Sequence, residues 1–247
     1  MEHLLRTSRL DLSGILSSSM AVIKTGFSRL IPLALLSAIP QAIILLLTQA
    51  DAFSQSSYDS LAPLCALCGF ELIFIVLITI TYIAGAYTVE AIVQDRPDGL
   101  STAFRYALSR LPQVLLVSII YGVIVMVGML LLIIPGIIVA FYLTFAYPAV
   151  ALRQVSLQAL QYSYQLVKGQ WWRVFGILLG IGLLNLIIVG PLTWLGGLLT
   201  SSSFNIGAIL INYLASTIAF FFGVPAIVFF LNEDYLAHPV QPETLPA

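Results

Sequence analysis

Six basic residues and two adjacent tryptophans are the side chains whose types and spacing indicate a function most clearly. In three segments a cation is followed five residues later by an arginine, and each pair stands before a long apolar run. Cationic and aromatic side chains at the border of an apolar helix are typical of contacts with anionic lipid headgroups. Ordinary anchoring of helices at a membrane surface would explain the same pattern. The candidate lipid contacts are Lys24, Arg29, Arg105, Arg110, Lys168, Trp171, Trp172 and Arg173.

A second group of polar side chains falls inside the apolar runs. A carboxylate within a bilayer is costly unless it is paired or reaches water. Glu90 is expected at an interface within reach of water, whereas the depth of Glu71 stays open because its apolar run is longer than a bilayer needs. Asn185 and Asn212 are expected to form interhelical hydrogen bonds more often than to bind a solute. The candidate intramembrane polar site is Glu71, Asn185 and Asn212.

Cys65 and Cys68 form a C-x-x-C motif one helical turn before Glu71. Redox or metal chemistry would need a polar setting and further ligands, so two small cysteines packed in a helix are the favoured interpretation. The sequence contains no phosphate-cradling loop, no catalytic triad and no histidine-rich metal set. We therefore expect no enzymatic activity, no catalytic residues and no cofactor. The expected partners are membrane lipids and other membrane proteins, not nucleic acid.

The composition indicates the class of protein in which these residues lie. Of the 247 residues 60% are hydrophobic and 9% are charged, whereas soluble domains carry about 25% charged residues. The apolar runs are continuous rather than alternating, which favours helices over a β-barrel. The expected fold is all-α and polytopic, in one membrane domain over residues 1–247.

Six spans follow from the apolar runs. Residues 111–152 carry no charge, and as one helix they would reach about 60 Å, twice the thickness of a bilayer core. They are therefore expected to fold back in a tight turn at Pro135 and Gly136. The predicted spans are 30–49, one crossing within 64–93 (either 64–88 or 72–92), 113–134, 137–152, 174–199 and 206–231, followed by a polar tail at 232–247.

The basic residues predict the orientation. All ten Lys and Arg fall before the first span, between the second and third spans, or between the fourth and fifth spans. The positive-inside rule then places those segments and both termini in the cytoplasm. Each basic segment also carries an apolar stripe at helical spacing, which predicts an amphipathic helix in the membrane interface. Asp11 or Ser13 is expected to cap the first of these helices.

These elements predict three parallel repeats over residues 11–93, 94–152 and 153–231. Each unit would be an interfacial helix followed by a hairpin of two spans. The ends of the second helices match in two units, Phe145-Ala-Tyr-Pro148 against Phe222-Gly-Val-Pro225. The alternative is that any protein obeying the positive-inside rule places cations at these positions.

Residues 133–176 resemble a known family. The motifs are Ile134-Pro135-Gly136-Ile137, Tyr147-Pro148-Ala149-Val150, Leu157-Gln158-Ala159-Leu160 and Tyr162-Ser163-Tyr164 followed by Lys168-Gly169-Gln170-Trp171-Trp172-Arg173. They resemble the YciC-like inner-membrane proteins and the membrane domain attached to some glycerophosphodiester phosphodiesterases. This chain departs from the family pattern at Arg153 and at Tyr162. The resemblance implies a six-span protein of the inner (plasma) membrane, without the barrel of about 250 residues that would carry the enzyme activity.

Two functions remain in view from the sequence. The leading one is a non-enzymatic protein that binds or organises lipid, or scaffolds partners, through the basic aromatic residues. The alternative is a small-solute or lipid transporter with a cavity between the repeats. A polar cavity at membrane depth, lined by Glu71, Asn185 and Asn212, would favour transport, and a solid apolar centre would favour the first function.

Overall fold

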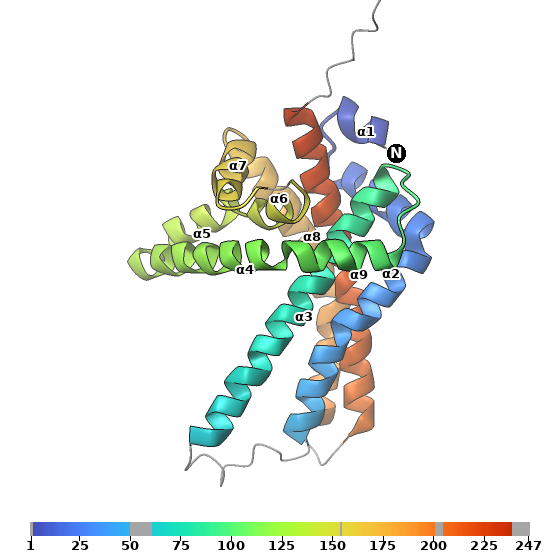
Figure 1. Ribbon diagram of the computed structural model, residues 1–247, viewed down its shortest axis with the longest axis vertical. Coiled ribbons are helices and arrows are strands. Elements are labelled where there is room, and N and C mark those ends of the chain that lie inside the picture. Colours follow the sequence, from blue (N-terminus) through green and yellow to red (C-terminus); the bar gives the residue numbers. More distant parts are fainter. Residues whose placement is uncertain (1, 50–60, 154, 201–204, 239–247) are drawn as a thin grey trace, which may run out of the picture.

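A computed structural model describes residues 2–49, 61–153, 155–200 and 205–238. The regular structure in these ranges is helical, and it comprises nine helices (Figure 1). They are α1 (Glu2–Thr7), α2 (Leu12–Gln49), α3 (Leu61–Val93), α4 (Leu100–Leu131), α5 (Ile133–Tyr142), α6 (Ala146–Leu152), α7 (Gln158–Val167), α8 (Trp171–Thr200) and α9 (Ile206–Ala237).

Six segments of the described chain are long and apolar enough to cross a membrane. Five of them lie in the long helices α2, α3, α4, α8 and α9, and the sixth comprises α5, a turn and α6. The helical, multi-pass class expected from composition is therefore confirmed.

The predicted interfacial helices are separate from the spans in only one of three cases. Helix α2 runs without interruption through the first basic segment and the first span, despite Pro32 and Pro40. Helix α4 likewise contains both the second basic segment and the third span. Only α7 is a helix of its own, divided from α8 by Lys168, Gly169 and Gln170.

Asp11 caps the start of α2. Its carboxylate accepts hydrogen bonds from the backbone N–H of Gly14 at 2.8 Å and from the hydroxyl of Ser13 at 2.8 Å. A helix leaves its first backbone N–H groups without partners inside the helix, so this acceptor stabilises the first turn. The Gly14 amide and the Ser13 hydroxyl together lower the pKa of Asp11.

The turn of the second hairpin lies three residues before the predicted position. Helix α4 ends at Leu131, Leu132 is extended (φ −161°, ψ 133°), and α5 begins at Ile133. Pro135 is the third residue of α5, where the backbone N–H has no partner inside the helix and a proline is tolerated. The predicted turn at Pro135 and Gly136 is therefore wrong, because both residues belong to the first turn of the returning helix.

The helix of the returning span is interrupted at residues 143–145, and Ser163 of α7 hydrogen-bonds the backbone on both sides of the interruption. Its hydroxyl accepts from the backbone N–H of Phe145 at 3.0 Å and donates to the carbonyl of Tyr142 at 2.8 Å. Ser163 is fully buried. Interrupted backbone at membrane depth requires such partners from neighbouring protein.

Gly136 allows α5 to lie directly against α4. A Cβ atom at this position would stand 2.6 Å from the backbone nitrogen of Met129 and 2.8 Å from its Cα. These are backbone atoms, so the two helices would have to separate.

We therefore expect Gly136→Ala to lower the free energy of unfolding by about 1–3 kcal/mol, the usual cost of overpacking. Thermal unfolding in detergent measures the change. Gly176→Ala in α8 is the matched control, because nothing lies within 4 Å of the added Cβ. Equal stability of the two variants would contradict the close approach.

Helix α9 extends beyond the predicted sixth span. It ends at Ala237 rather than Leu231, and Asn232, Glu233, Asp234 and Tyr235 are buried. The predicted tail is therefore helical over residues 232–237 and packed over residues 232–235. Thirty-two residues of helix reach about 48 Å, well beyond a bilayer core of about 30 Å, so one end of α9 projects from the membrane.

The packed core lies around that projecting end of α9. Phe229, Phe230 and Leu231 are fully buried together with Leu5 of α1. At the other extreme, residues 130–134 at the tip of the α4–α5 hairpin are exposed by 67–79%. In Figure 1 α4 and α5 run across the view while α2 and α9 run along it, so the hairpins do not share one direction there.

Candidate functional site

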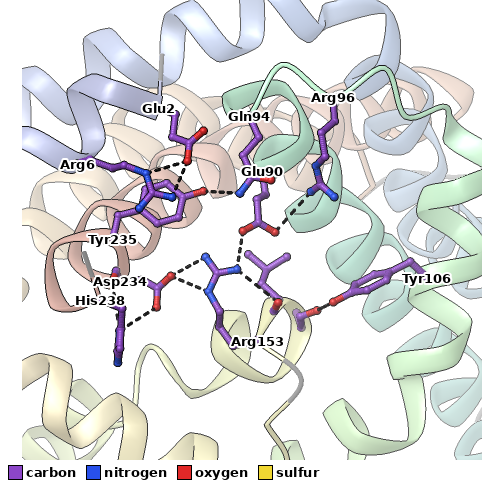
Figure 2. Close-up of polar contacts among 12 residues, drawn as sticks. Glu2, Arg6, Glu90, Gln94, Arg96, Tyr106, Arg153, Asp234, Tyr235 and His238 are labelled. Carbon is purple, nitrogen blue, oxygen red and sulfur yellow. Dashed lines mark hydrogen bonds and ion pairs between the residues drawn. The ribbon is translucent and has the colours of Figure 1, made fainter. Parts of the chain in front are cut away.

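Three consecutive polar residues at the end of α9 organise a buried polar cluster. Asn232, Glu233 and Asp234 are between 0 and 4% exposed. Successive residues of a helix point about 100° apart, so each side chain meets a different part of the chain. Figure 2 shows the part of the cluster around Asp234. We call these three residues and their partners the polar hub.

Asp234 and Glu90 lie on either side of Arg153. The Arg153 Nε donates to Asp234 Oδ2 at 2.6 Å, and its Nη1 donates to Glu90 Oε1 at 2.5 Å (Figure 2). Glu90 lies in the last turn of α3, Arg153 follows α6 and Asp234 belongs to α9, so one guanidinium joins three segments. Glu90 does not face water as predicted, because its side chain is 7% exposed and paired with Arg153.

The positive charge of Arg153 is stabilised by its two acidic partners. Burial alone lowers the pKa of Arg153, but the negative charges of Glu90 and Asp234 outweigh it, and the net pKa is raised. Tyr162 of α7 donates its hydroxyl to the other oxygen of Asp234. Burial and that hydrogen bond raise the pKa of Tyr162, so this phenol stays protonated and keeps donating at neutral pH.

Glu233 faces the start of α8. Its carboxylate accepts from the guanidinium of Arg173 and, at 2.5 Å, from the amide of Gln170. The same guanidinium donates from Nη2 to the carbonyl of Leu10 at 2.7 Å. Glu233 therefore connects α9 and α8, and Arg173 connects them to the N-terminal arm.

Asn232 holds the N-terminal arm, residues 2–10. Its amide donates to the carbonyls of Leu5 at 2.8 Å and Ser8 at 2.9 Å, and its oxygen accepts from the N–H of Leu10 at 3.1 Å. Within the arm, Arg6 pairs with Glu2 at 2.5 Å and lies over the ring of Tyr235 at 4.2 Å. The arm is thus part of the packed end of the molecule.

The polar hub is close to electroneutral. Glu90, Glu233 and Asp234 face Arg153 and Arg173, with Arg96 3.8 Å from Glu90. Each carboxylate is already occupied by a cation or a hydrogen-bond donor, which leaves no free base or nucleophile. Among the described residues, no group of three or more His, Cys, Asp or Glu could hold a metal ion. The hub therefore fits a structural role in joining helix ends.

The predicted lipid contacts divide into two groups. In the first group the cation has a partner within the protein. Arg173 forms an ion pair with Glu233, Arg29 donates to the carbonyl of Arg96 at 3.1 Å, and Arg110 lies over the ring of Tyr106 at 5.5 Å. Lys24, Arg105 and Lys168 are exposed, and none of them pairs with an acid in the part of the chain that the structure describes. These three, together with exposed Trp172, form what we call the cationic rim.

The rim adjoins an apolar groove between α5 and α8. Trp171 and Trp172 line it with Ile134, Ile137, Ile138 and Tyr142, and its volume is about 450 Å³. Trp171 is stacked on Phe175 at a centroid distance of 5.1 Å, whereas Trp172 is 78% exposed. The ring of Trp171 is therefore held by packing, whereas the ring of Trp172 projects from the protein surface.

The predicted intramembrane residues are placed separately. Glu71 is exposed in the first third of α3, away from Glu90 near the other end of that helix. Asn185 is half-buried in α8. Asn212 donates to the carbonyl of Ala208 in its own helix at 2.9 Å, and a Cβ at Gly196 of α8 would collide with its amide. Asn212 is therefore a packing contact between α8 and α9. The side chains of Cys65 and Cys68 lie outside the described residues.

Sequence reasoning missed the hub residues at 153 and 232–234. The signal was present in Asn232-Glu233-Asp234, three polar residues directly after an apolar run, and in the lone cation Arg153 after another. Both were assigned to loops or a tail. A buried charge needs a partner far along the chain, and no periodicity identifies that partner.

Comparison with family models, with curated proteins and with solved structures finds no match for this chain.

Proposed function

We propose that this chain is a non-enzymatic membrane protein that gathers anionic lipids around one end through its cationic rim. The observation that carries the proposal is the division of the cations. Arg153 and Arg173 are occupied by buried acids, while Lys24, Arg105 and Lys168 face outward without acidic partners among the described residues. Each cation near an anionic membrane surface contributes about 1 kcal/mol of attraction.

The groove beside Trp171 and Trp172 supports this function. Its lining is almost wholly apolar or aromatic, and Lys168 stands three residues before Trp171. An acyl chain against the isoleucines would leave its headgroup near that lysine, at the level where tryptophan prefers to lie.

The transporter hypothesis receives less support. Two grooves of about 210 and 490 Å³ lie among α2, α3, α8 and α9, and their linings are mostly apolar. Glu71, Asn185 and Asn212 line neither of them. We therefore favour lipid organisation over passage of a polar solute.

Mass spectrometry of the lipids retained after gentle purification tests the proposal. For Lys24→Gln/Arg105→Gln/Lys168→Gln we expect a severalfold loss of anionic lipid per protein and no loss of zwitterionic lipid, because each cation contributes about 1 kcal/mol to its own lipid contact, which is about fivefold in occupancy. Arg110→Gln is the matched control, because this cation lies over the ring of Tyr106 and does not belong to the rim. Unchanged anionic lipid in the triple variant would refute the function. Arg173 is left intact, since its removal would expose Glu233 rather than test lipid binding.

We further propose that the rim faces the cytoplasm of a bacterial-type inner (plasma) membrane, with both termini on that side. All ten Lys and Arg lie in segments that the positive-inside rule assigns to the cytoplasm, and the YciC-like resemblance supports the same membrane. A reporter enzyme fused after Tyr58 should behave as exported. Cytoplasmic behaviour of that fusion would reverse the orientation.

The three-repeat origin also remains a proposal. It is supported by the matched motifs ending in Pro148 and Pro225, since both prolines are buried in the helices that return to the polar hub. Phe145, which begins the first motif, packs against Phe229 in the helix of the second at 5.3 Å.

A further inference from the structure

A half-enclosed polar pocket of about 320 Å³ lies beside the polar hub, between the N-terminal arm, α7 and the end of α9. Its lining includes Arg9, Gln165, Lys168, Glu233 and His238. The residues come from three segments far apart in sequence. Pockets of this size accommodate small ligands.

The charges lining the pocket do not cancel. Both oxygens of Glu233 are engaged, one by Arg173 and one by Gln170. The positive charges of Arg9 and Lys168 have no acid partner among the residues that the structure describes. The pocket therefore carries a surplus of positive charge.

The helix ends around the pocket largely offset one another. Gln170 lies at the N-terminal end of α8, where the helix dipole places partial positive charge, whereas Leu166 and Ala237 lie at the C-terminal ends of α7 and α9, where it places partial negative charge. The positive surplus therefore comes from the side chains of Arg9 and Lys168. The backbone next to Arg9 is held in place, because Leu10 is bonded to Asn232 and to Arg173.

We propose that this pocket binds a phosphate group, with Arg9 and Lys168 as its cationic ligands and Gln165 as a hydrogen-bond donor. A tetrahedral dianion matches two cations and a polar amide better than a carboxylate does. The phosphate belongs either to a small soluble phosphate or to a lipid headgroup. The site is distinct from the cationic rim, with which it shares only Lys168.

Thermal unfolding of the full-length protein tests both sources of phosphate. In detergent, inorganic phosphate is titrated at constant ionic strength with chloride as the balancing anion. In nanodiscs, phosphatidylglycerol is compared with phosphatidylcholine. Arg9→Gln and Lys168→Gln should weaken the saturable stabilisation about tenfold or more, as expected for a lost charge-assisted hydrogen bond. Arg9→Lys should retain part of it, and Arg110→Gln, which alters a cation outside both the rim and the pocket, should retain all of it.

The outcomes separate the cases. A phosphate response that requires Arg9 supports the site with a soluble ligand. A phosphatidylglycerol response that requires Arg9, without a response to inorganic phosphate, supports the site with a headgroup. If neither response changes in Arg9→Gln while the protein remains folded by circular dichroism, the proposal is overturned. Failure of the cationic rim appears instead as unchanged anionic lipid in Lys24→Gln/Arg105→Gln, a variant that leaves both pocket cations, Arg9 and Lys168, in place.

Discussion

Replacing Arg153 with methionine lowers the free energy of unfolding by about 2–4 kcal/mol. The change leaves buried Asp234 without its arginine, and leaves buried Glu90 with Arg96 at 3.8 Å as its remaining cation. Breaking a fully buried pair costs about 3–5 kcal/mol, and the expectation here is smaller because 24% of the Arg153 side chain reaches solvent. Thermal unfolding in detergent, followed by tryptophan fluorescence, measures the loss.

Two further variants separate lost charge from lost packing. Arg105→Met removes an exposed cation and should change stability by less than about 0.5 kcal/mol. Adding Glu90→Gln and Asp234→Asn to Arg153→Met should recover part of the loss, because neutral amides are cheaper to bury than carboxylates. A triple variant no more stable than the single variant would show that packing, not charge, dominates.

Replacing Asn232 with leucine detaches the N-terminal arm. The substitution removes three hydrogen bonds to the backbone of residues 5–10 from a fully buried side chain. Buried backbone groups left without partners cost about 1–3 kcal/mol each. The arm should therefore leave the hub, so that its backbone groups form hydrogen bonds with water instead. We expect amide hydrogen exchange in residues 2–10 to accelerate at least about tenfold.

The same substitution elsewhere in α9 provides the control. Asn212→Leu changes a residue that bonds within its own helix and contacts α8, far from the arm. Exchange in residues 2–10 should therefore match that of the unaltered protein. Slow exchange of the arm in Asn232→Leu would mean that the apolar contacts of Leu5 hold it without help.

The apolar runs predict the membrane class and the six spans because a helix must match the thickness of a bilayer, and length alone tests that match. The turn between α4 and α5 lies three residues before the predicted position, because neither Pro135 nor Gly136 forms the turn. The proline fits the first turn of α5, and the glycine permits contact with Met129. Local turn signals do not distinguish these roles.

The polar hub could not be predicted because it depends on distances between helix ends. Arg153 looked like one more cytoplasmic cation, yet it differs from Lys168 in having two buried acids within reach. Which cations pair with acids and which remain exposed is decided by packing, and that division separates the structural arginines from the cationic rim.

Fluorescence quenching by brominated lipids tests the central claim, that the rim selects anionic lipid, most directly. In nanodiscs, a variant with Trp172 as its sole tryptophan (Trp171→Phe/Trp194→Phe) should be quenched more by brominated phosphatidylglycerol than by brominated phosphatidylcholine at the same mole fraction. That difference should disappear when Lys24, Arg105 and Lys168 are also changed to glutamine. Equal quenching by the two lipids before the rim is altered would contradict the account.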